Sequence, residues 1–303
     1  MKNKYKKLKN LLFKPFYFFY YKLMYMMKSR SSIFLYWFNL GQNFGDSINP
    51  LLVSILSSKK VFYIEPKFSC TPYVSAIGSI IEHGNKNTVI WGSGFISSDS
   101  ELKQMPLKVL AVRGPRSRDR FLKYGVDCPV VYGDPALLLP RVYFPKIEKR
   151  YKYGFIPHHS DLDNTWLKNN VENNEELLII DLTKMDMGEV IEEILSCEKI
   201  ISSSLHGIIT ADAYGIPSVW IEFSNKVWGK GFKFLDYFES VGRKEKTPLA
   251  ITKATSIEEI SSLFYEYNIQ IDLDKLIKAA PFEISFPQNI EDNPFQVLKE
   301  RHG

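Results

Sequence analysis

The stretch KIISSSLHGIITADAYGIPSVWIEF, residues 199–223, predicts a strand, a helix and a second strand in direct succession. Its apolar start ends in three serines, the segment LHGIITADAYG has a helical pattern that stops at a glycine, and PSVWIEF is rich in strand-forming residues. Two strands joined by a helical crossover run parallel in the same sheet. The stretch therefore predicts an α/β fold built on a parallel sheet.

The same alternation of apolar runs and helical segments covers most of the chain. Further strands are expected at 32–38, 87–95, 108–114, 128–139, 153–159 and 176–182. A basic, proline-containing segment at 139–152 is typical of a linker. We therefore expect two doubly wound, Rossmann-like domains facing a cleft, with ligands beyond the strand ends. The expected divisions are a basic aromatic segment, two α/β domains and a helical tail, at 1–30, 31–140, 141–255 and 256–303.

The composition is that of a globular protein, with 45% hydrophobic and 24% charged residues among 303. The three cysteines, Cys70, Cys128 and Cys197, are far apart and form no CxxC pair. This spacing argues against a structural zinc site and against a disulfide framework. A cytoplasmic, reducing location is therefore expected.

Positive charge is concentrated at the N-terminus. The first 30 residues hold nine lysines and arginines and no acid, whereas the rest of the chain carries 30 basic and 34 acidic residues. A mildly acidic body argues against nucleic-acid binding. The uninterrupted apolar run at 16–21 is too short to cross a bilayer, and no signal-cleavage site follows it. Lysines mixed with aromatic residues favour peripheral binding to the inner face of an anionic membrane; packing on the protein's own surface is the alternative.

The serines of the opening stretch predict an anion site. Ser203, Ser204 and His206 fall where a strand passes into a helix, and the first turn of a helix presents unpaired N–H groups and a positive dipole end. His206 would lie beside a bound anion and could donate a proton near neutral pH. The alternative is that the serines cap the helix and His206 is a packed, half-buried side chain.

Two further groups of candidates follow strand ends. Arg113 ends the strand in AVRGPRSRDRF, where its planar guanidinium suits a carboxylate or phosphate, and Arg116 follows it. His158 and His159 end the strand in GFIPHHSD; adjacent side chains point to opposite faces, so one of them at most reaches a given site. This adjacency is also unsuited to chelation, which argues against a metal.

Two aspartates stand at glycine turns. Asp46 in NFGDSI opens a helix, either as its N-cap or as a carboxylate that accepts a proton from a sugar hydroxyl. Asp134 precedes Pro135 and is expected to shape the turn. The sequence has no GxGxxG, P-loop or GxSxG motif, so dinucleotide binding, P-loop NTP binding and nucleophile-elbow hydrolysis are not supported.

Taken in order, six motifs resemble the polysaccharide pyruvyl transferase family. They are NFGDSI (43–48), WGSGF (91–95), AVRGPRSRDRFLKYG (111–125), YGDPALLLP (132–140), GFIPHHSD (154–161) and SSSLHGIITADAYGIPSVWI (202–221). The resemblance implies a fold like the two-domain GT-B glycosyltransferases and phosphoenolpyruvate as donor substrate, with no metal or other cofactor. The implied product is a pyruvate ketal on a sugar of a cell-surface polysaccharide or of its lipid-linked precursor.

In the implied reaction, His206 is the general acid and Asp46 the general base. Arg113 binds the donor carboxylate or phosphate, and the helix start at Ser203–Ser204 takes the phosphate. Many family members have arginine directly before LHG, where this chain has Ser204. The anion's charge must then be met elsewhere, by Arg113, Arg116 or one of the histidines His158 and His159.

Two other functions fit the same sequence. One is a nucleotide-sugar glycosyltransferase of the same architecture, which would bind a nucleoside diphosphate at the same helix start. The other is a non-catalytic member of a polysaccharide assembly complex, which would bind the membrane through its N-terminus without turning over a donor.

Overall fold

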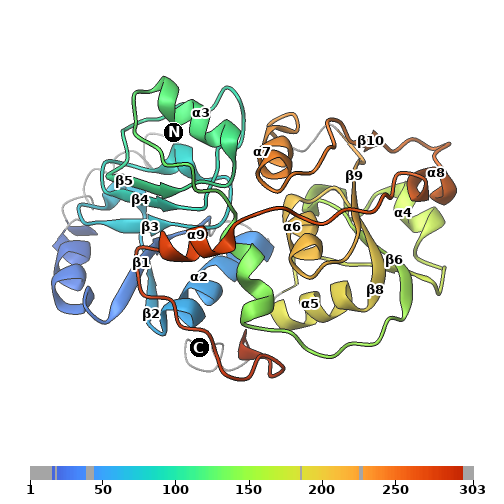
Figure 1. Cartoon of the computed structure of the whole chain (residues 1–303), viewed down its shortest axis with the longest axis horizontal. Coiled ribbons are helices and arrows are strands. Elements are labelled where there is room, and N and C mark those ends of the chain that lie inside the picture. The colour runs from blue at the N-terminus through green and yellow to red at the C-terminus, as the bar shows by residue number, and fades with distance from the viewer. Residues whose placement is uncertain (1–15, 18, 39–43, 185, 225–227, 296–303) are drawn as a thin grey trace, which may run out of the picture.

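Two parallel five-stranded sheets form the framework of the molecule (Figure 1). The computed structural model describes residues 16–17, 19–38, 44–184, 186–224 and 228–295. The first sheet has the order β2-β1-β3-β4-β5, with β1 at Ser32–Tyr36, β2 at Lys60–Tyr63, β3 at Tyr73–Ser75, β4 at Thr88–Trp91 and β5 at Lys108–Ala111. The second has the order β10-β9-β8-β6-β7, with β6 at Tyr151–Ile156, β7 at Leu177–Ile179, β8 at Cys197–Ser202, β9 at Ser218–Glu222 and β10 at Leu249–Ala250.

Helices connect and cover these strands. They are α2 (Phe44–Ser57), α3 (Pro115–Lys123), α4 (Thr165–Asn170), α5 (Met187–Leu195), α6 (Leu205–Ala213), α7 (Phe232–Ser240), α8 (Ile257–Ser261) and α9 (Leu273–Lys278). Four 3-10 turns accompany them: η1 (Pro66–Phe68), η2 (Ile81–His83), η3 (Pro135–Arg141) and η4 (His159–Asp161). Residues 19–28 are helical as well. The prediction of an α/β fold with parallel sheets is confirmed.

Both sheets have the same strand order when their strands are counted along the chain. In each, the first strand lies between the second and the third, so the order reverses between β1 and β3 and again between β6 and β8. Loops leaving the carboxyl ends of strands at such a reversal diverge and leave room for a ligand. The loops after β1, β3, β6 and β8 are therefore the places to look for a site.

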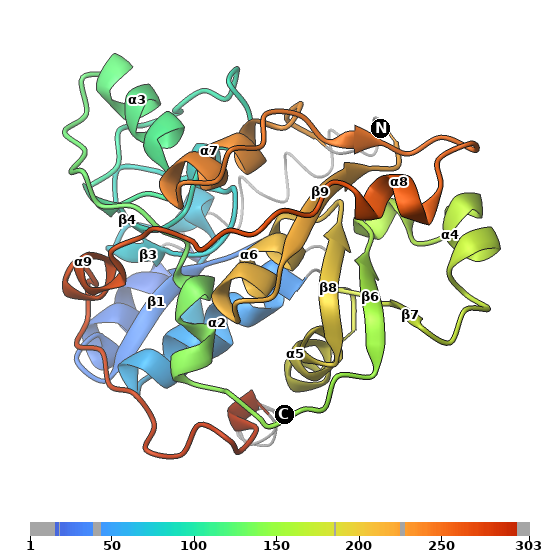
Figure 2. The same ribbon diagram turned by 45° about the vertical axis from the view of Figure 1, so that its right-hand side comes forward.

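The unit that opened the analysis folds as expected, with β8, α6 and β9 in succession. Gly207 permits the close packing, because a Cβ atom there would lie 2.6 Å from Ser202 Oγ and 2.8 Å from Ile156 Cγ2. Figure 2 shows α6 lying across the strands of this sheet. The α6 helix is buried on almost every residue, which a helix tucked between a sheet and a second layer requires.

One predicted strand is wrong, and three short ones, β2, β3 and β10, were missed. In place of a strand at 128–139 the chain makes a single bridge at Tyr132 and then the 3-10 helix η3, because Pro135 and Pro140 have no N–H to pair in a ladder. Strands β2 and β3 are short, at four and three residues, and were not expected. Their brevity gives too few alternating positions to distinguish them from loop.

The C-terminal tail returns to the first sheet (Figure 1). Trp91 Nε1 in β4 donates to the Leu276 carbonyl in α9 at 2.8 Å, and the Trp91 ring meets Phe282 edge-on at 5.3 Å. The Ser285 N–H donates to the Leu56 carbonyl of α2. The expected tail at 256–303 thus contains α8 and α9 and a non-helical return, with 296–303 outside the described residues.

A buried ion pair joins the two halves of the chain. Arg113, just after β5, is fully buried and contacts Asp236 in α7 at 3.0 Å. Asp236 also accepts hydrogen bonds from the N–H and hydroxyl of Ser117 at 2.8 and 2.7 Å. The exposed pair of Arg116 with Glu239, at 2.7 Å, joins the same helices α3 and α7 at the surface.

These two pairs predict very different losses of stability. Asp236→Ala should lower the free energy of unfolding by about 3–5 kcal/mol, because it leaves the Arg113 guanidinium buried without its counter-ion. Arg116→Ala is the matched control and should cost less than about 1 kcal/mol, because water solvates both partners of that pair. Denaturant unfolding measures both. Equal losses in the two variants would contradict the expectation.

Candidate functional site

The site lies where the first turn of α2 meets the first turn of α6. A Cβ atom at Gly45 would lie only 2.0 Å from His206 Cε1, so the imidazole ring lies against bare backbone at the start of α2. Gly45 follows the first strand of one sheet, and His206 follows the third strand of the other. Glycine is needed at this position because any side chain would displace the ring.

His206 faces a carboxylate from a third element. Its Nε2 lies 3.8 Å from Oδ2 of Asp134, the residue that precedes η3. Both atoms are buried, and neither has a hydrogen-bond partner among the described residues. Asp134 does shape the turn as expected, since its Oδ1 accepts from the Ala136 N–H at 3.0 Å. Its other oxygen and His206 Nε2 form an unsatisfied polar pair, which marks a place for a ligand or a proton.

Burial shifts both of these groups toward their neutral forms. It lowers the pKa of His206 to about 3, together with the nearby cations Lys233 and Arg113. Burial raises the pKa of Asp134 to about 6, although the Ala136 N–H and Arg113 oppose this. In the ligand-free protein the imidazole is therefore neutral at pH 7.

Asp46 occupies the first turn of α2, one residue after Gly45. Burial raises the pKa of Asp46 to about 7, against the Phe38 N–H and the Lys233 ammonium, which favour the charged form. A carboxyl group poised at this pH can accept or donate a proton under cellular conditions. Asp46 and His206 thus lie on the two helices, α2 and α6, whose first turns meet.

Lys233, in the first turn of α7, is the residue that sequence reasoning missed. Burial lowers the pKa of Lys233 to about 8, and Arg113 adds to this while Asp46 opposes it. Its charge also lowers the pKa of His158, which burial brings to about 3, so Lys233 acts on His158, His206 and Asp46 together. The available signal was a lone lysine between Phe232 and Phe234 in an apolar helix after a glycine-rich turn.

Arg113 has a full set of internal partners. Besides Asp236, its guanidinium donates to Ser79 Oγ at 2.6 Å and to the Phe95 carbonyl at 2.7 Å. A Cβ atom at Gly94 would lie 2.4 Å from Arg113 Cζ, so the surrounding chain closes over it. Its role as a direct donor ligand stays a prediction, while its contacts make it a buried charge beside the site.

The helix start at α6 is arranged as an anion site would be. The Ser204 hydroxyl does not cap α6, and Ser202 Oγ holds the Ser204 N–H at 3.0 Å instead. Ser203 Oγ accepts from the His158 N–H at 2.8 Å, which joins the ends of β8 and β6. The hydroxyl hydrogens of Ser203 and Ser204 stand beside the first turn of the helix.

His158 joins the site through Ser203, whereas His159 and Arg116 lie farther out. His158 Nδ1 lies 2.8 Å from Ser160 Oγ, and its ring lies 4.1 Å from that of the exposed His159. Arg116 lies at the surface with Glu239. The structure thus gathers Asp46, His158, Ser203, Ser204 and His206 together with Lys233 and Asp134, and leaves Arg116 and His159 at the edge. Among the described residues, no group of three or more His, Cys, Asp or Glu side chains could hold a metal ion.

The depressed pKa of His206 predicts a specific dependence of stability on pH. An unfolded histidine binds a proton below about pH 6.5, whereas folded His206 does not until about pH 3. Wild-type protein should therefore lose stability from this group as the pH falls through that window. In His206→Gln this contribution is absent, so the difference in free energy of unfolding between wild type and variant should change steadily from pH 6.5 downward. An NMR titration of the His206 ring with a midpoint near 6.5 would refute this.

Comparison with known proteins agrees with the motifs. The family model described as polysaccharide pyruvyl transferase matches residues 3–225. An uncharacterized protein of Acanthamoeba polyphaga mimivirus is 33% identical over 220 residues, which cover 70% of this chain and 76% of that protein. The succinoglycan biosynthesis protein ExoV of Rhizobium meliloti is 26% identical over 229 residues, 71% of this chain and 67% of ExoV. The chain therefore belongs to the polysaccharide pyruvyl transferase family.

Proposed function

We propose that this protein transfers the pyruvate unit of phosphoenolpyruvate to two hydroxyls of one sugar in a cell-surface polysaccharide or its lipid-linked precursor, forming a cyclic ketal. The observation that carries this proposal is the meeting of an acid–base pair, His206 and Asp46, with the start of α6 and the ammonium of Lys233. An enol phosphate needs one proton donated, one proton accepted and two negative groups held. The site contains a group for each task.

In this proposal Lys233 supplies the positive charge that an arginine at the position of Ser204 would otherwise provide. Family members often carry arginine at that position, and this chain instead has a lysine that reaches the same groups from α7. A dianionic phosphate at the first turn of α6 would be met by backbone N–H groups, by the serine hydroxyls and by this ammonium. The donor carboxylate lies toward Arg113, whose buried charge acts on the same space.

The proton steps follow from the charges. Burial and, to a smaller extent, two neighbouring cations hold His206 neutral. Binding an anion offsets the two cations, which raises the pKa of His206 and lets it take up a proton. Protonated His206 donates to the methylene carbon of phosphoenolpyruvate, and a sugar hydroxyl bonds to the cationic carbon as Asp46 accepts its proton. Phosphate leaves with its bonding electron pair. The second hydroxyl then bonds to the same carbon and releases its proton, which completes the ketal.

We propose a GT-B-like arrangement for the chain, with its ligands between the two sheets. The same arrangement suits the two alternative functions, a nucleotide-sugar glycosyltransferase and a non-catalytic member of an assembly complex. A glycosyltransferase would place a nucleoside diphosphate at the start of α6. A non-catalytic member would leave the glycan unchanged. Incubation with a lipid-linked or synthetic glycan plus phosphoenolpyruvate or nucleotide sugars, followed by mass spectrometry, separates the three outcomes: a pyruvate ketal, an added sugar or no change.

Two variants test the proton assignments. His206→Ala and Asp46→Asn should each lower acceptor-dependent phosphate release by about 10²–10⁴-fold, which is the usual contribution of general acid–base catalysis. Loss of the acid should flatten the alkaline limb of the pH–rate profile, and loss of the base the acidic limb. If Asp46→Asn flattens the alkaline limb, the two roles are exchanged. If His206→Ala releases phosphate at the wild-type rate, His206 is not the acid.

The N-terminal segment supports peripheral binding to the inner membrane surface. No helix among the described residues is long and apolar enough to span a bilayer. Phe16, Phe19, Leu23, Met26 and Met27 recur at helical spacing and are 44–72% exposed. The other face, with Tyr21, Met24 and Tyr25, packs against β1 and β2. One face of the segment thus packs on the protein's own surface, and the other is exposed and is the face that we propose to bind the membrane. Residues 1–15 lie outside the described residues.

An exposed apolar face beside nine basic residues predicts binding to anionic vesicles. Phe19→Ser with Met27→Ser should reduce sedimentation with phosphatidylglycerol vesicles several-fold, and high salt should reduce it further by screening the lysines. Met105→Ser, at another exposed apolar side chain, is the control and should bind as wild type does. Binding that resists both salt and the double substitution would refute this location.

A further inference from the structure

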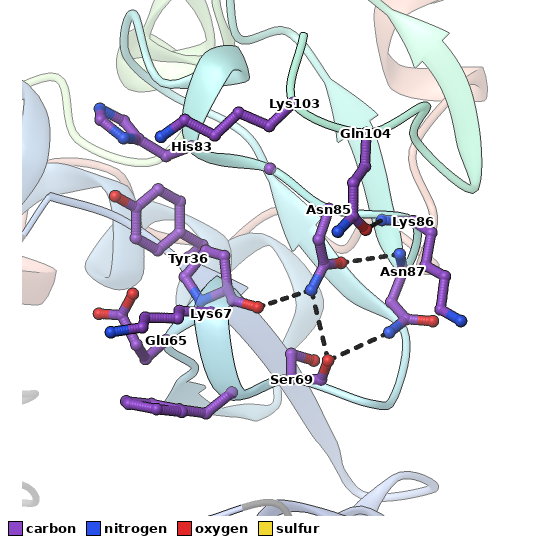
Figure 3. Close-up of a pocket in the computed structure, with 13 residues that line it drawn as sticks. Tyr36, Glu65, Lys67, Ser69, His83, Asn85, Lys86, Asn87, Lys103 and Gln104 are labelled. Atoms are coloured by element: carbon purple, nitrogen blue, oxygen red, sulfur yellow. Dashed lines mark hydrogen bonds between the residues drawn. The ribbon is translucent and has the colours of Figure 1, made fainter. Parts of the chain in front are cut away.

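A second pocket lies in the first half of the molecule, outside the acid–base site. Its volume is about 510 Å³, within the range of small-molecule sites. It is bounded by the end of β1, by η1 and the residues after it, by the turn before β4, and by residues 103–104. Figure 3 shows the rings of Tyr36 and His83 beside the side chains of Glu65, Lys67 and Lys103.

The opposite wall of the pocket is held by its own hydrogen bonds (Figure 3). Asn85 Nδ2 donates to the Pro66 carbonyl at 2.6 Å and to the Ser69 carbonyl at 3.3 Å. Asn87 Nδ2 donates to the same Ser69 carbonyl at 3.2 Å. These bonds tie the turn before β4 to η1. The pocket is therefore formed before a ligand arrives, which lowers the entropic cost of binding.

The chemistry of the lining suits a saccharide. Tyr36 and His83 present rings 6.2 Å apart at 64°, and Phe68 adds a third ring. Sugars offer apolar C–H faces to such rings and hydroxyls to charged groups, and Glu65 supplies a carboxylate acceptor.

The lining also carries an excess of positive charge. Three lysines, Lys67, Lys86 and Lys103, line the pocket together with the single carboxylate of Glu65. Burial and Lys103 lower the pKa of His83, so the imidazole adds no charge at neutral pH. A surplus of ammonium groups favours a ligand that carries a negative group of its own.

The pocket lies next to Asp46. Tyr36 lines the pocket. Phe38 comes two residues later, and its N–H donates a hydrogen bond to the Asp46 carboxyl. The Phe38 ring is also 6.3 Å from that of His83. A chain of sugars held in the pocket would therefore present a neighbouring sugar to the proposed base.

We propose that this pocket binds a saccharide segment of the acceptor that bears a negative group, either a sugar carboxylate or a glycosyl phosphate, adjacent to the sugar that receives pyruvate. This inference rests on the proposed function. The N-terminal segment packs against two residues of the pocket lining, since Tyr17 stacks on Phe68 at 5.1 Å and the Tyr21 hydroxyl accepts from the Glu65 N–H at 3.4 Å. The pocket therefore lies beside the face proposed to rest on the membrane, where a lipid-linked acceptor is anchored.

Calorimetric titration of the full-length protein tests the pocket with three probes: trigalacturonate, galactose 1-phosphate and neutral galactotriose. At least one charged probe should bind, and its identity tells a carboxylate source from a phosphate source. Lys67→Met with Lys103→Met should raise its Kd at least tenfold. The control, Lys123→Met with Lys253→Met, removes the same charge from exposed positions elsewhere and should leave the Kd unchanged.

Absence of binding by both charged probes would overturn the proposal. So would equal Kd values for wild type and the pocket variant, or binding of galactotriose as tight as that of the charged probes. Glu65→Gln is a second variant at the carboxylate and should also weaken binding. Titration with phosphoenolpyruvate separates this inference from the proposed function, because the pocket variant should bind it as wild type does. Saccharide binding without any binding of phosphoenolpyruvate would refute the proposed function alone.

Discussion

The buried pair of Arg113 and Asp236 is the interaction on which the site depends. It brings the end of β5 against α7, and the first turn of α7 carries Lys233, three residues before Asp236. Residues three apart on a helix share a face, so fixing Asp236 also directs Lys233 toward α2 and α6. A buried ion pair adds little net stability compared with apolar packing. Here the ion pair fixes the position of α7, which carries the Lys233 ammonium.

The same burial determines the protonation states of the site. His206, Asp134, Asp46 and Lys233 all shift toward their neutral forms, because desolvation is the largest influence on each. The Lys233 ammonium and the Phe38 N–H oppose the effect of burial on the pKa of Asp46. At Lys233, Arg113 adds to the effect of burial on the pKa, and Asp46 opposes it. Desolvation therefore determines the direction of the pKa shift at all four groups.

The sequence predicted the parts of the fold that local pattern determines. The strand–helix–strand unit at 199–223 has long apolar runs and clear glycine and serine boundaries, and it folds as expected. The motif turns containing Asp46, Ser203 and His206 do converge. Asp46 follows a strand of the first sheet and the other two follow a strand of the second, and the start of α2 packs against the start of α6. The local sequence pattern could not predict that Asp134 lies opposite His206, or that Lys233 lies near Asp46. These pairs are 72 and 187 residues apart, and tertiary packing alone brings them together.

The proposal that Lys233 supplies the cation in place of an arginine at the position of Ser204 has a physical consequence. An arginine before α6 would sit on the same element as His206 and move with it. Lys233 belongs to α7 and is positioned through Asp236 by Arg113, which comes from the first half of the chain. The charge that we propose to bind the donor and the imidazole that we propose to protonate it then come from separate elements. Correct assembly requires both halves to be packed together, so the site is complete only in the folded whole.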